Sequence, residues 1–365
     1  MDVSLLGHGI RLPKLVPPGP MLEMRPPRKV NLLLQQSAGP TCAPVVDEGD
    51  EVKRGQTVAE GARWEAADLH TPVCGVVKGF EDLVAPDGTP TRAMIVEADG
   101  RNEAEEPEAD SEPLTRKPEE LLERLRRGGV VTKRGAARSL EAIIGEAMNP
   151  RSVIPATGAV IGRPVRQIAI RFTDVDPYLV TLRTLTDALA ERIPEIELGI
   201  RVLLRITRAE SVHFVMDRTQ EAQQVRQLAY DNDYAINTVD ARVYPSASDP
   251  MVAAAVSGRE PDVAFRGMHE SGVLILDIDT LLQVTQAVAE RRPVLEKIIT
   301  VAGPGGAKVV RTWTGVSLAD IAEAGGQQGD FGKIILGGPM QGSAHHTLDF
   351  PIAKDTLALY LIPRE

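Results

Sequence analysis

The sequence predicts a multidomain α/β protein with an N-terminal all-β barrel, a central parallel α/β domain and a C-terminal β-grasp-like module. Short, Val-rich alternating runs fill the first 100 of its 365 residues, and helical and strand patterns then alternate up to about residue 290. From about residue 295, short strands return around one helix. We place the domains at 1–100, 118–292 and 293–365, with a linker at 101–117.

The N-terminal region contains two similar halves. The first reads VVDEGDEVKRGQTVAE, in which Gly-Asp and Arg-Gly pairs are turn signals between Val-rich runs, and the second reads LHTPVCGVVKGF. Two such halves predict the flattened barrel, or barrel-sandwich hybrid, of biotinyl and lipoyl carrier domains. Those carriers have a lysine at the tip of the hairpin between the halves, whereas residues 61–66 read GARWEA. We therefore expect no covalently attached swinging arm.

The predicted linker is strongly acidic. Residues 103–113, EAEEPEADSEP, carry six carboxylates and two prolines without a large apolar side chain. Such a segment cannot bury enough apolar surface to order itself, which favours a solvated linker. The alternative is an acidic docking segment.

The central region alternates helices with strands. A helix is predicted from Pro118 and ends at Gly128-Gly129, since proline fits a first turn and glycine a helix end. RQIAIRF at 166–172 reads as a strand, and a helical stretch at 178–206 is expected to break at Pro194. Further strands and helices follow in turn. This alternation predicts a parallel sheet with helices on its faces.

The last 70 residues combine short strands with a single helix. The strand patterns are KIITVAG, AKVVRTW, KIILGGP and TLALYLIP, and the helix is SLADIAEAGG. We interpret this part as a β-grasp-like α+β module.

Composition excludes several classes of function. A net charge of −10 argues against binding to nucleic acid. The two cysteines exclude a disulfide framework and any four-thiolate iron–sulfur cluster built from this chain alone. No apolar run reaches the 18 or more residues of a membrane span, and the N-terminus lacks the pattern of a secretory signal. We expect a cytoplasmic protein without a span of its own, which could still dock on a membrane complex.

Independent hydrolytic or metal chemistry has no support in the motifs. No Ser-His-Asp order, HExxH, P-loop or CxxC motif is present. His345-His346 lacks a third ligand at useful spacing, so we interpret it as a surface loop. Cys42 and Cys74 fall in equivalent halves of the barrel, where buried thiols are favoured over a redox pair.

Several of these segments together resemble a known family. The runs GHGIRLPK, GDEVKRGQTVAE…LHTPVCGVV, DVDPYLV, YPSASDPMVAAAVSGRE, KIITVAG and GGPMQGSAHHTLDFPIAKDTLALYL look like the C subunit of Rnf electron-transport complexes. The A subunit of the sodium-pumping NADH:quinone reductase is a more distant relative. The segments keep the family order from about residue 7 to 362, and GGPMQG…LDFPIAKDT is the most specific stretch.

The resemblance implies a soluble subunit, peripheral to the inner membrane, of an ion-translocating redox complex with membrane-embedded and redox subunits as partners. The central domain would be similar to the flavin- and NADH-binding subunit of respiratory complex I, and the C-terminal part to a ligand-binding SLBB module. In this family a ferredoxin-type cysteine run follows, but no cysteine occurs after Cys74. We therefore expect no iron–sulfur cluster in this chain and a separate ferredoxin-like protein as a partner.

The resemblance also locates a candidate cofactor site in three loops. The glycine-rich phosphate loop of the family has become GGVVTKRGAARS, which keeps three glycines, Gly128, Gly129 and Gly135, spread apart, and adds cations that could pair with phosphate. Alternatively, Gly128 and Gly129 end a helix and the cations form a solvated face. An acidic loop and a Tyr-Pro loop complete the site, although the usual glycines of the latter are replaced by alanine and serine. The candidate residues are Gly128, Gly129, Lys133, Arg134, Asp174, Asp176, Tyr178 and Tyr244.

We expect these loops to meet at the carboxyl edge of the parallel sheet, where ligands of α/β proteins bind. Larger residues stand there in place of the family's glycines and narrow the crevice, so binding of FMN or NADH is expected to be weak or absent. The leading hypothesis is a docking or scaffold subunit with a degenerate flavin/NADH site. One alternative is an NADH- or flavin-binding oxidoreductase subunit that passes electrons to a separate iron–sulfur partner. Another is a quinone-site subunit resembling the A subunit of the sodium pump.

Overall fold

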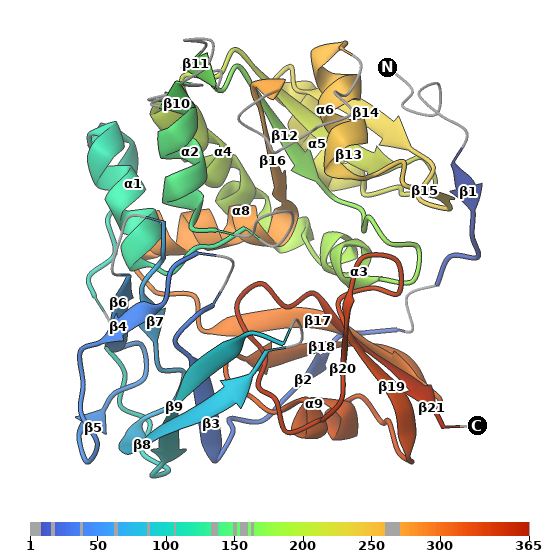
Figure 1. Cartoon of the computed structure of the whole chain (residues 1–365). Coiled ribbons are helices and arrows are strands. Elements are labelled where there is room, and N and C mark those ends of the chain that lie inside the picture. Colours follow the sequence, from blue (N-terminus) through green and yellow to red (C-terminus); the bar gives the residue numbers. More distant parts are fainter. Residues whose placement is uncertain are drawn as a thin grey trace. The chain divides into compact units, whose positions relative to one another are not determined.

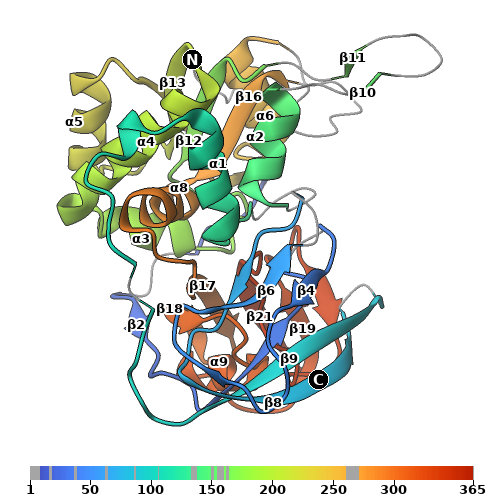
Figure 2. The same cartoon turned by 90° about the vertical axis from the view of Figure 1, so that its left-hand side faces the viewer.

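The structure is a computed structural model in which the chain folds into two units, each described here by itself. The first unit comprises Met1–Leu15, Asp110–Arg124 and Leu140–Ala289, and the second Val16–Ala109, Leu125–Ser139 and Glu290–Glu365. Figures 1 and 2 show the elements of both. The residues described are 9–15, 19–36, 39–61, 65–85, 88–105, 107–132, 138–148, 152–153, 160–161, 164–259 and 271–364.

A four-stranded parallel sheet organises the first unit, as the sequence predicts. Its strand order is β14-β13-β12-β16, and all three pairings are parallel (Figure 1). β16 is buried along its whole length, which is typical of a strand covered on both faces. The strands are β12 (Gln167–Arg171), β13 (Ser211–Asp217), β14 (Ala235–Val239) and β16 (Val273–Asp277).

Helices connect these strands. The predicted break near Pro194 is present, because α3 ends at Asp187 and α4 begins at Ile193 with Pro194 in its first turn. Two short antiparallel pairs, β1 (Ile10–Arg11) with β15 (Val243–Tyr244) and β10 (Ser152–Val153) with β11 (Val160–Ile161), complete the strands. The helices are α2 (Leu140–Met148), α3 (Thr181–Asp187), α4 (Ile193–Thr207), α5 (Gln223–Asp231), α6 (Asp249–Ser257) and α8 (Ile278–Thr285), with 3-10 turns at Pro113–Thr115 and Ala190–Arg192 and a π-helical turn at Gln286–Glu290. Helix α1 (Pro118–Arg127) is divided between the two units.

The second unit is mostly β. Its N-terminal part has two antiparallel sheets, β3-β9-β8-β5 and β4-β6-β7, and its C-terminal part a six-stranded mixed sheet of order β2-β18-β17-β21-β19-β20. Helix α9 (Leu318–Ala324) packs on the mixed sheet (Figure 2). The strands are β2 (Leu22–Glu23), β3 (Lys29–Leu33), β4 (Cys42–Pro44), β5 (Glu51–Val52), β6 (Thr57–Gly61), β7 (Leu69–His70), β8 (Gly75–Val84), β9 (Pro90–Ala98), β17 (Glu296–Gly303), β18 (Gly306–Trp313), β19 (Phe331–Leu336), β20 (Ser343–His345) and β21 (Ala358–Pro363).

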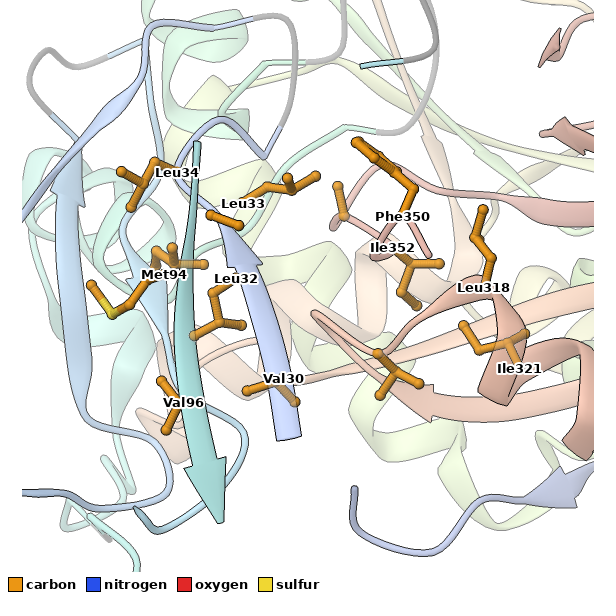
Figure 3. Close-up of a cluster of buried hydrophobic side chains, with 14 of the residues drawn as sticks. Val30, Leu32, Leu33, Leu34, Met94, Val96, Leu318, Ile321, Phe350 and Ile352 are labelled. Atoms are coloured by element: carbon orange, nitrogen blue, oxygen red, sulfur yellow. The ribbon is translucent and has the colours of Figure 1, made fainter. Parts of the chain in front are cut away.

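One hydrophobic core joins the two parts of the second unit. Val30 and Leu32 of β3 belong to the same buried cluster as Leu318 of α9 and Ile352 (Figure 3). The Asn31 amide also donates to the Gly315 carbonyl at 2.8 Å. The N- and C-terminal segments, predicted as successive domains, therefore share a core, because small sheets bury their apolar faces better together.

The predicted acidic linker contains an anchored residue. Asp110 accepts hydrogen bonds from Arg116 Nε at 2.8 Å and Arg124 Nη1 at 2.7 Å, and its side chain is only 5% exposed. These ion pairs hold the end of the segment on the first unit, which composition alone does not predict. Among the described residues, no helix is long and apolar enough to cross a membrane.

Candidate functional site

The carboxyl edge of the parallel sheet collects charged side chains. Arg171, Asp217 and Asp277 are the last residues of β12, β13 and β16. Because the strands are parallel, these residues and the loops that follow them lie on one edge, the usual ligand side of an α/β sheet. The buried carboxylates in or next to these loops are Asp174, Asp176, Asp217, Asp240, Asp277 and Asp279.

Arg171 connects three elements at this edge. Its Nε donates to Asp277 Oδ1 at 2.7 Å, and its Nη1 donates to Asp249 Oδ1 at 2.8 Å and to the Ala247 carbonyl at 2.7 Å. Burial alone would lower the pKa of Arg171, but the two carboxylates outweigh it and raise that pKa. The sequence patterns do not predict a role for this residue. An arginine ending an otherwise apolar strand is the signal that a buried carboxylate partner is needed.

Asp174 and Asp176 bind backbone amides of their own loop. Both carboxylate oxygens of Asp174 accept from the Leu182 amide at 3.1 Å, in the first turn of α3. Asp176 Oδ1 accepts from the Tyr178 amide at 2.9 Å. These contacts favour structural roles for both carboxylates, in turn formation and in holding the start of α3.

The N-terminal segment reaches the same edge. Ile10 pairs with Tyr244 in the β1–β15 ladder, and the Leu12 amide donates to the Arg242 carbonyl at 2.8 Å. Further along, Lys14 Nζ donates to Asp217 Oδ2 at 2.6 Å. Burial raises the pKa of Asp217, but the hydrogen bond and charge of Lys14, together with hydrogen bonds from Thr219 and the Ala241 amide, outweigh it and lower that pKa.

The predicted glycines lie in the second unit. Gly129 has φ +74°, its amide donates to the Arg126 carbonyl at 3.0 Å, and the Val130 amide donates to the Leu125 carbonyl at 3.0 Å. This pair of bonds around a left-handed glycine is the Schellman motif that ends a helix, here α1. A Cβ at Gly129 would lie 2.8 Å from the Asp68 carbonyl oxygen. The geometry thus supports the helix-end interpretation of the two glycines.

Of the predicted site residues, Asp174, Asp176 and Tyr178 lie in the loop after β12, and Tyr244 lies in the short strand β15 that follows β14. Gly128 and Gly129 belong to the other unit. Lys133 and Arg134 lie outside the described residues, so their part in the site remains a prediction.

A second group of buried charges surrounds Lys354. This side chain is 1% exposed, and its Nζ donates to the Asp68 carbonyl at 2.7 Å. Burial lowers the pKa of Lys354 to about 8, whereas it raises the pKa of Cys42 to about 11 and that of Asp355 to about 6. Lys297 Nζ donates to the Lys354 carbonyl. The sequence patterns do not predict this group, although the lysine lies in the most specific stretch, FPIAKDT.

Metal ligation has no support in the part of the chain that the structure describes, where no group of three or more His, Cys, Asp or Glu side chains could hold an ion. The His345 ring stacks on His346 with centroids 4.9 Å apart, and its Nδ1 lies 2.9 Å from the Thr347 carbonyl oxygen. Cys42 and Cys74 are buried free thiols.

A flavin or nicotinamide nucleotide fits the carboxyl edge poorly. Phosphates and ribose hydroxyls need donors and carboxylates that are available to them. The guanidinium of Arg171 is instead bound to Asp249 and Asp277, and Asp174 binds the start of α3. The buried Thr173 Oγ1 and Gln220 Oε1 lack a hydrogen-bond partner, but neither atom carries a charge for a phosphate.

Comparisons with known proteins agree with the sequence resemblance. A model of the RnfC barrel sandwich hybrid domain matches residues 14–101, which confirms the predicted fold of the N-terminal region. The C subunit of the ion-translocating oxidoreductase complex of Haemophilus influenzae (strain 86-028NP) is 27% identical over 330 residues, 88% of this chain and 47% of the relative. The C subunit of the proton-translocating ferredoxin:NAD(+) oxidoreductase complex of Clostridium ljungdahlii is 25% identical over 346 residues, 91% of this chain and 70% of the relative.

A solved structure resembles the fold. An NAD+-reducing [NiFe]-hydrogenase in the air-oxidized state aligns with a TM-score of 0.50 and 15% identity, over 68% of this chain and 47% of the hydrogenase chain. At this identity the likeness concerns the fold alone. The chain spans about half the length of the Haemophilus relative. The matched N-terminal domain and the relatives along most of the sequence together support the assignment of the chain to the RnfC family.

Proposed function

We propose that the chain is a peripheral subunit of an Rnf-type ion-translocating electron-transfer complex, at the cytoplasmic face of the inner membrane. In this proposal it acts as a scaffold that docks a redox partner, such as a separate ferredoxin-like protein, onto the membrane-embedded subunits. Similarity to RnfC proteins supports the assembly, since the relatives are named as subunits of such complexes. The order β18-β17-β21-β19-β20 around α9 supports a β-grasp module of the SLBB type.

The proposal that the nucleotide site is degenerate rests on one observation: charged side chains at the carboxyl edge are paired with one another. A nucleotide would have to displace Asp249 and Asp277 from Arg171, a buried network whose disruption leaves uncompensated charges. A new charge pair between the nucleotide and a partly exposed side chain would stabilise the complex by only about 0–1 kcal/mol. We therefore expect dissociation constants for FMN and NADH no better than the millimolar order, or about −4 kcal/mol.

Two measurements test this function. Calorimetric titration of the purified chain with NADH and FMN should give millimolar or undetectable binding. Micromolar binding that disappears in Asp176→Ala would contradict the degenerate site. A tagged chain isolated from detergent-solubilised membranes of its own host should bring down membrane-embedded subunits of an ion-translocating oxidoreductase. Recovery of the chain only from the soluble fraction, without those subunits, would contradict the docking role.

The second candidate is an NADH- or flavin-binding oxidoreductase subunit that passes electrons to a separate iron–sulfur partner. The unpartnered buried Thr173 Oγ1 and Gln220 Oε1 favour it, because a bound ligand would satisfy both atoms. The fold likeness to the hydrogenase chain is compatible with it. An absorbance spectrum of the protein as purified separates the candidates, since bound flavin gives visible bands and the scaffold is colourless.

A further inference from the structure

The N-terminal segment 9–15 follows the carboxyl edge of the parallel sheet across three neighbouring strands. Gly9 to Leu12 contact the segment that follows β14. Ile10 pairs with Tyr244, and the Leu12 amide donates to the Arg242 carbonyl. Lys14 binds the last residue of β13, and the Leu15 amide donates to the Pro177 carbonyl at 3.0 Å in the loop after β12. Since β14, β13 and β12 are adjacent in the sheet, the segment runs along its ligand side.

Beyond these backbone bonds, an ion pair and a close backbone approach mark the two ends of the segment. Lys14 is paired with Asp217 at 2.6 Å, and the two side chains are only 10% and 4% exposed, so this charge pair is far less screened than a surface pair. Arg183 also approaches Asp217, at 3.7 Å. At the other end Gly9 lies so close to β15 that a Cβ there would be 2.6 Å from the Tyr244 carbonyl oxygen. A substituent at either end should loosen the segment.

From this placement we infer that residues 9–15 form an autoinhibitory strap, which occupies the ligand edge of the sheet and excludes a nucleotide until it is displaced. The inference deepens the proposed function, because it assigns part of the expected weak NADH binding to a removable segment rather than to the lost glycines. A nucleotide that lies along the edge must compete with the Lys14–Asp217 pair and with the backbone bonds at Leu12 and Leu15. Weakening the strap should therefore tighten binding.

The test compares NADH affinity in the full chain and in two variants. Gly9→Ala pushes the strap away from Tyr244 and keeps Lys14, whereas Lys14→Met removes the anchor and keeps the backbone contacts. Each should tighten NADH binding at least tenfold by calorimetry. Lys78→Met, at an exposed pair with Glu97 in the other unit, is the control and should leave the affinity unchanged. Unchanged or weaker binding in both folded strap variants would overturn the inference.

A measurement on the unaltered protein keeps the test valid if a variant does not fold. At saturating NADH, hydrogen exchange at the Leu12 and Leu15 amides should accelerate, because the ligand displaces the segment that protects them. Slower or unchanged exchange at both amides would overturn the strap. The wild-type affinity tests the degenerate site of the proposed function, whereas the ratio of variant to wild type tests the strap, so either can fail alone.

Discussion

Each unit of the protein buries a cationic side chain, and the two are held in different ways. Arg171 in the first unit is 2% exposed and binds the carboxylates of Asp249 and Asp277. Lys354 in the second unit is 1% exposed and donates to the backbone carbonyl of Asp68. The pKa of Arg171 is raised, whereas that of Lys354 is lowered to about 8. Ionised carboxylates offset the cost of burying the protonated cation, whereas a neutral carbonyl offsets only part of that cost.

The chemistry of the two side chains fits this difference. A guanidinium stays protonated and presents several donors in one plane, so it can join the ends of separate elements, as Arg171 joins β16 and the start of α6. An ammonium group shifts its pKa readily when it is buried. The first unit therefore depends on a fixed charge network, and the second on a titratable group.

Breaking the charge network should have the largest effect. Arg171→Met leaves Asp277 buried without its guanidinium partner, which should lower the free energy of unfolding by about 3–5 kcal/mol. Denaturation followed by far-UV circular dichroism measures this, because most of the helices belong to the first unit. Arg101→Ala, at an ion pair whose side chains are 43% and 24% exposed, should leave the midpoint nearly unchanged. Equal loss in both variants would mean that Arg171 does not hold the edge together.

A methyl group beside Lys354 should have the next largest effect. Gly129→Ala forces a left-handed φ on alanine and pushes the new Cβ against Lys354 and the Asp68 carbonyl, for a loss of roughly 2–4 kcal/mol. Gly326→Ala is the matched control. Gly326 also ends a helix with φ +73°, but its Cβ would meet open space, so only the smaller conformational loss is expected.

Tryptophan fluorescence is suited to this comparison, because Trp313 ends β18 in the second unit. A loss at Gly129 no greater than the loss at Gly326 would show that the contact with Lys354 does not constrain the helix end.

Local patterns predicted more of the fold than of the site. The strand at 166–172 and the break at Pro194 follow from alternation and from the missing proline amide, which are properties of the segment itself. The shared core of β3 and Ile352 could not be predicted in the same way, because it joins residues more than 300 positions apart. The Arg171 and Lys354 environments are likewise set by distant partners, Asp277 and Asp68.

The third prediction concerns the pH dependence of stability, which Lys354 should contribute and Arg171 should not. Unfolded Lys354 has a pKa near 10.5 and the folded one about 8, so between these values the unfolded state binds more protons. The stability of the second unit should therefore rise with pH, by at most about 1.4 kcal/mol per pH unit. Measurement between pH 8 and 9 avoids the opposing titration of Cys42, which begins near its ordinary pKa of 9.0. Lys354→Met should abolish the rise, and a rise that persists in this variant would contradict the assignment.

The smallest effect is expected where a carboxylate accepts hydrogen bonds from backbone amides at the start of a helix. Asp174 accepts from the Leu182 and Arg183 amides at the start of α3, so Asp174→Ala should lower the stability of the first unit by about 1 kcal/mol. Asp174→Asn keeps an acceptor oxygen at the same place and should recover most of that loss, because a cap needs an acceptor rather than a charge. Circular dichroism melts of the two variants measure the difference. If asparagine proves as damaging as alanine, the negative charge itself is required, and Asp174 belongs with Arg171 among the electrostatic supports of the edge.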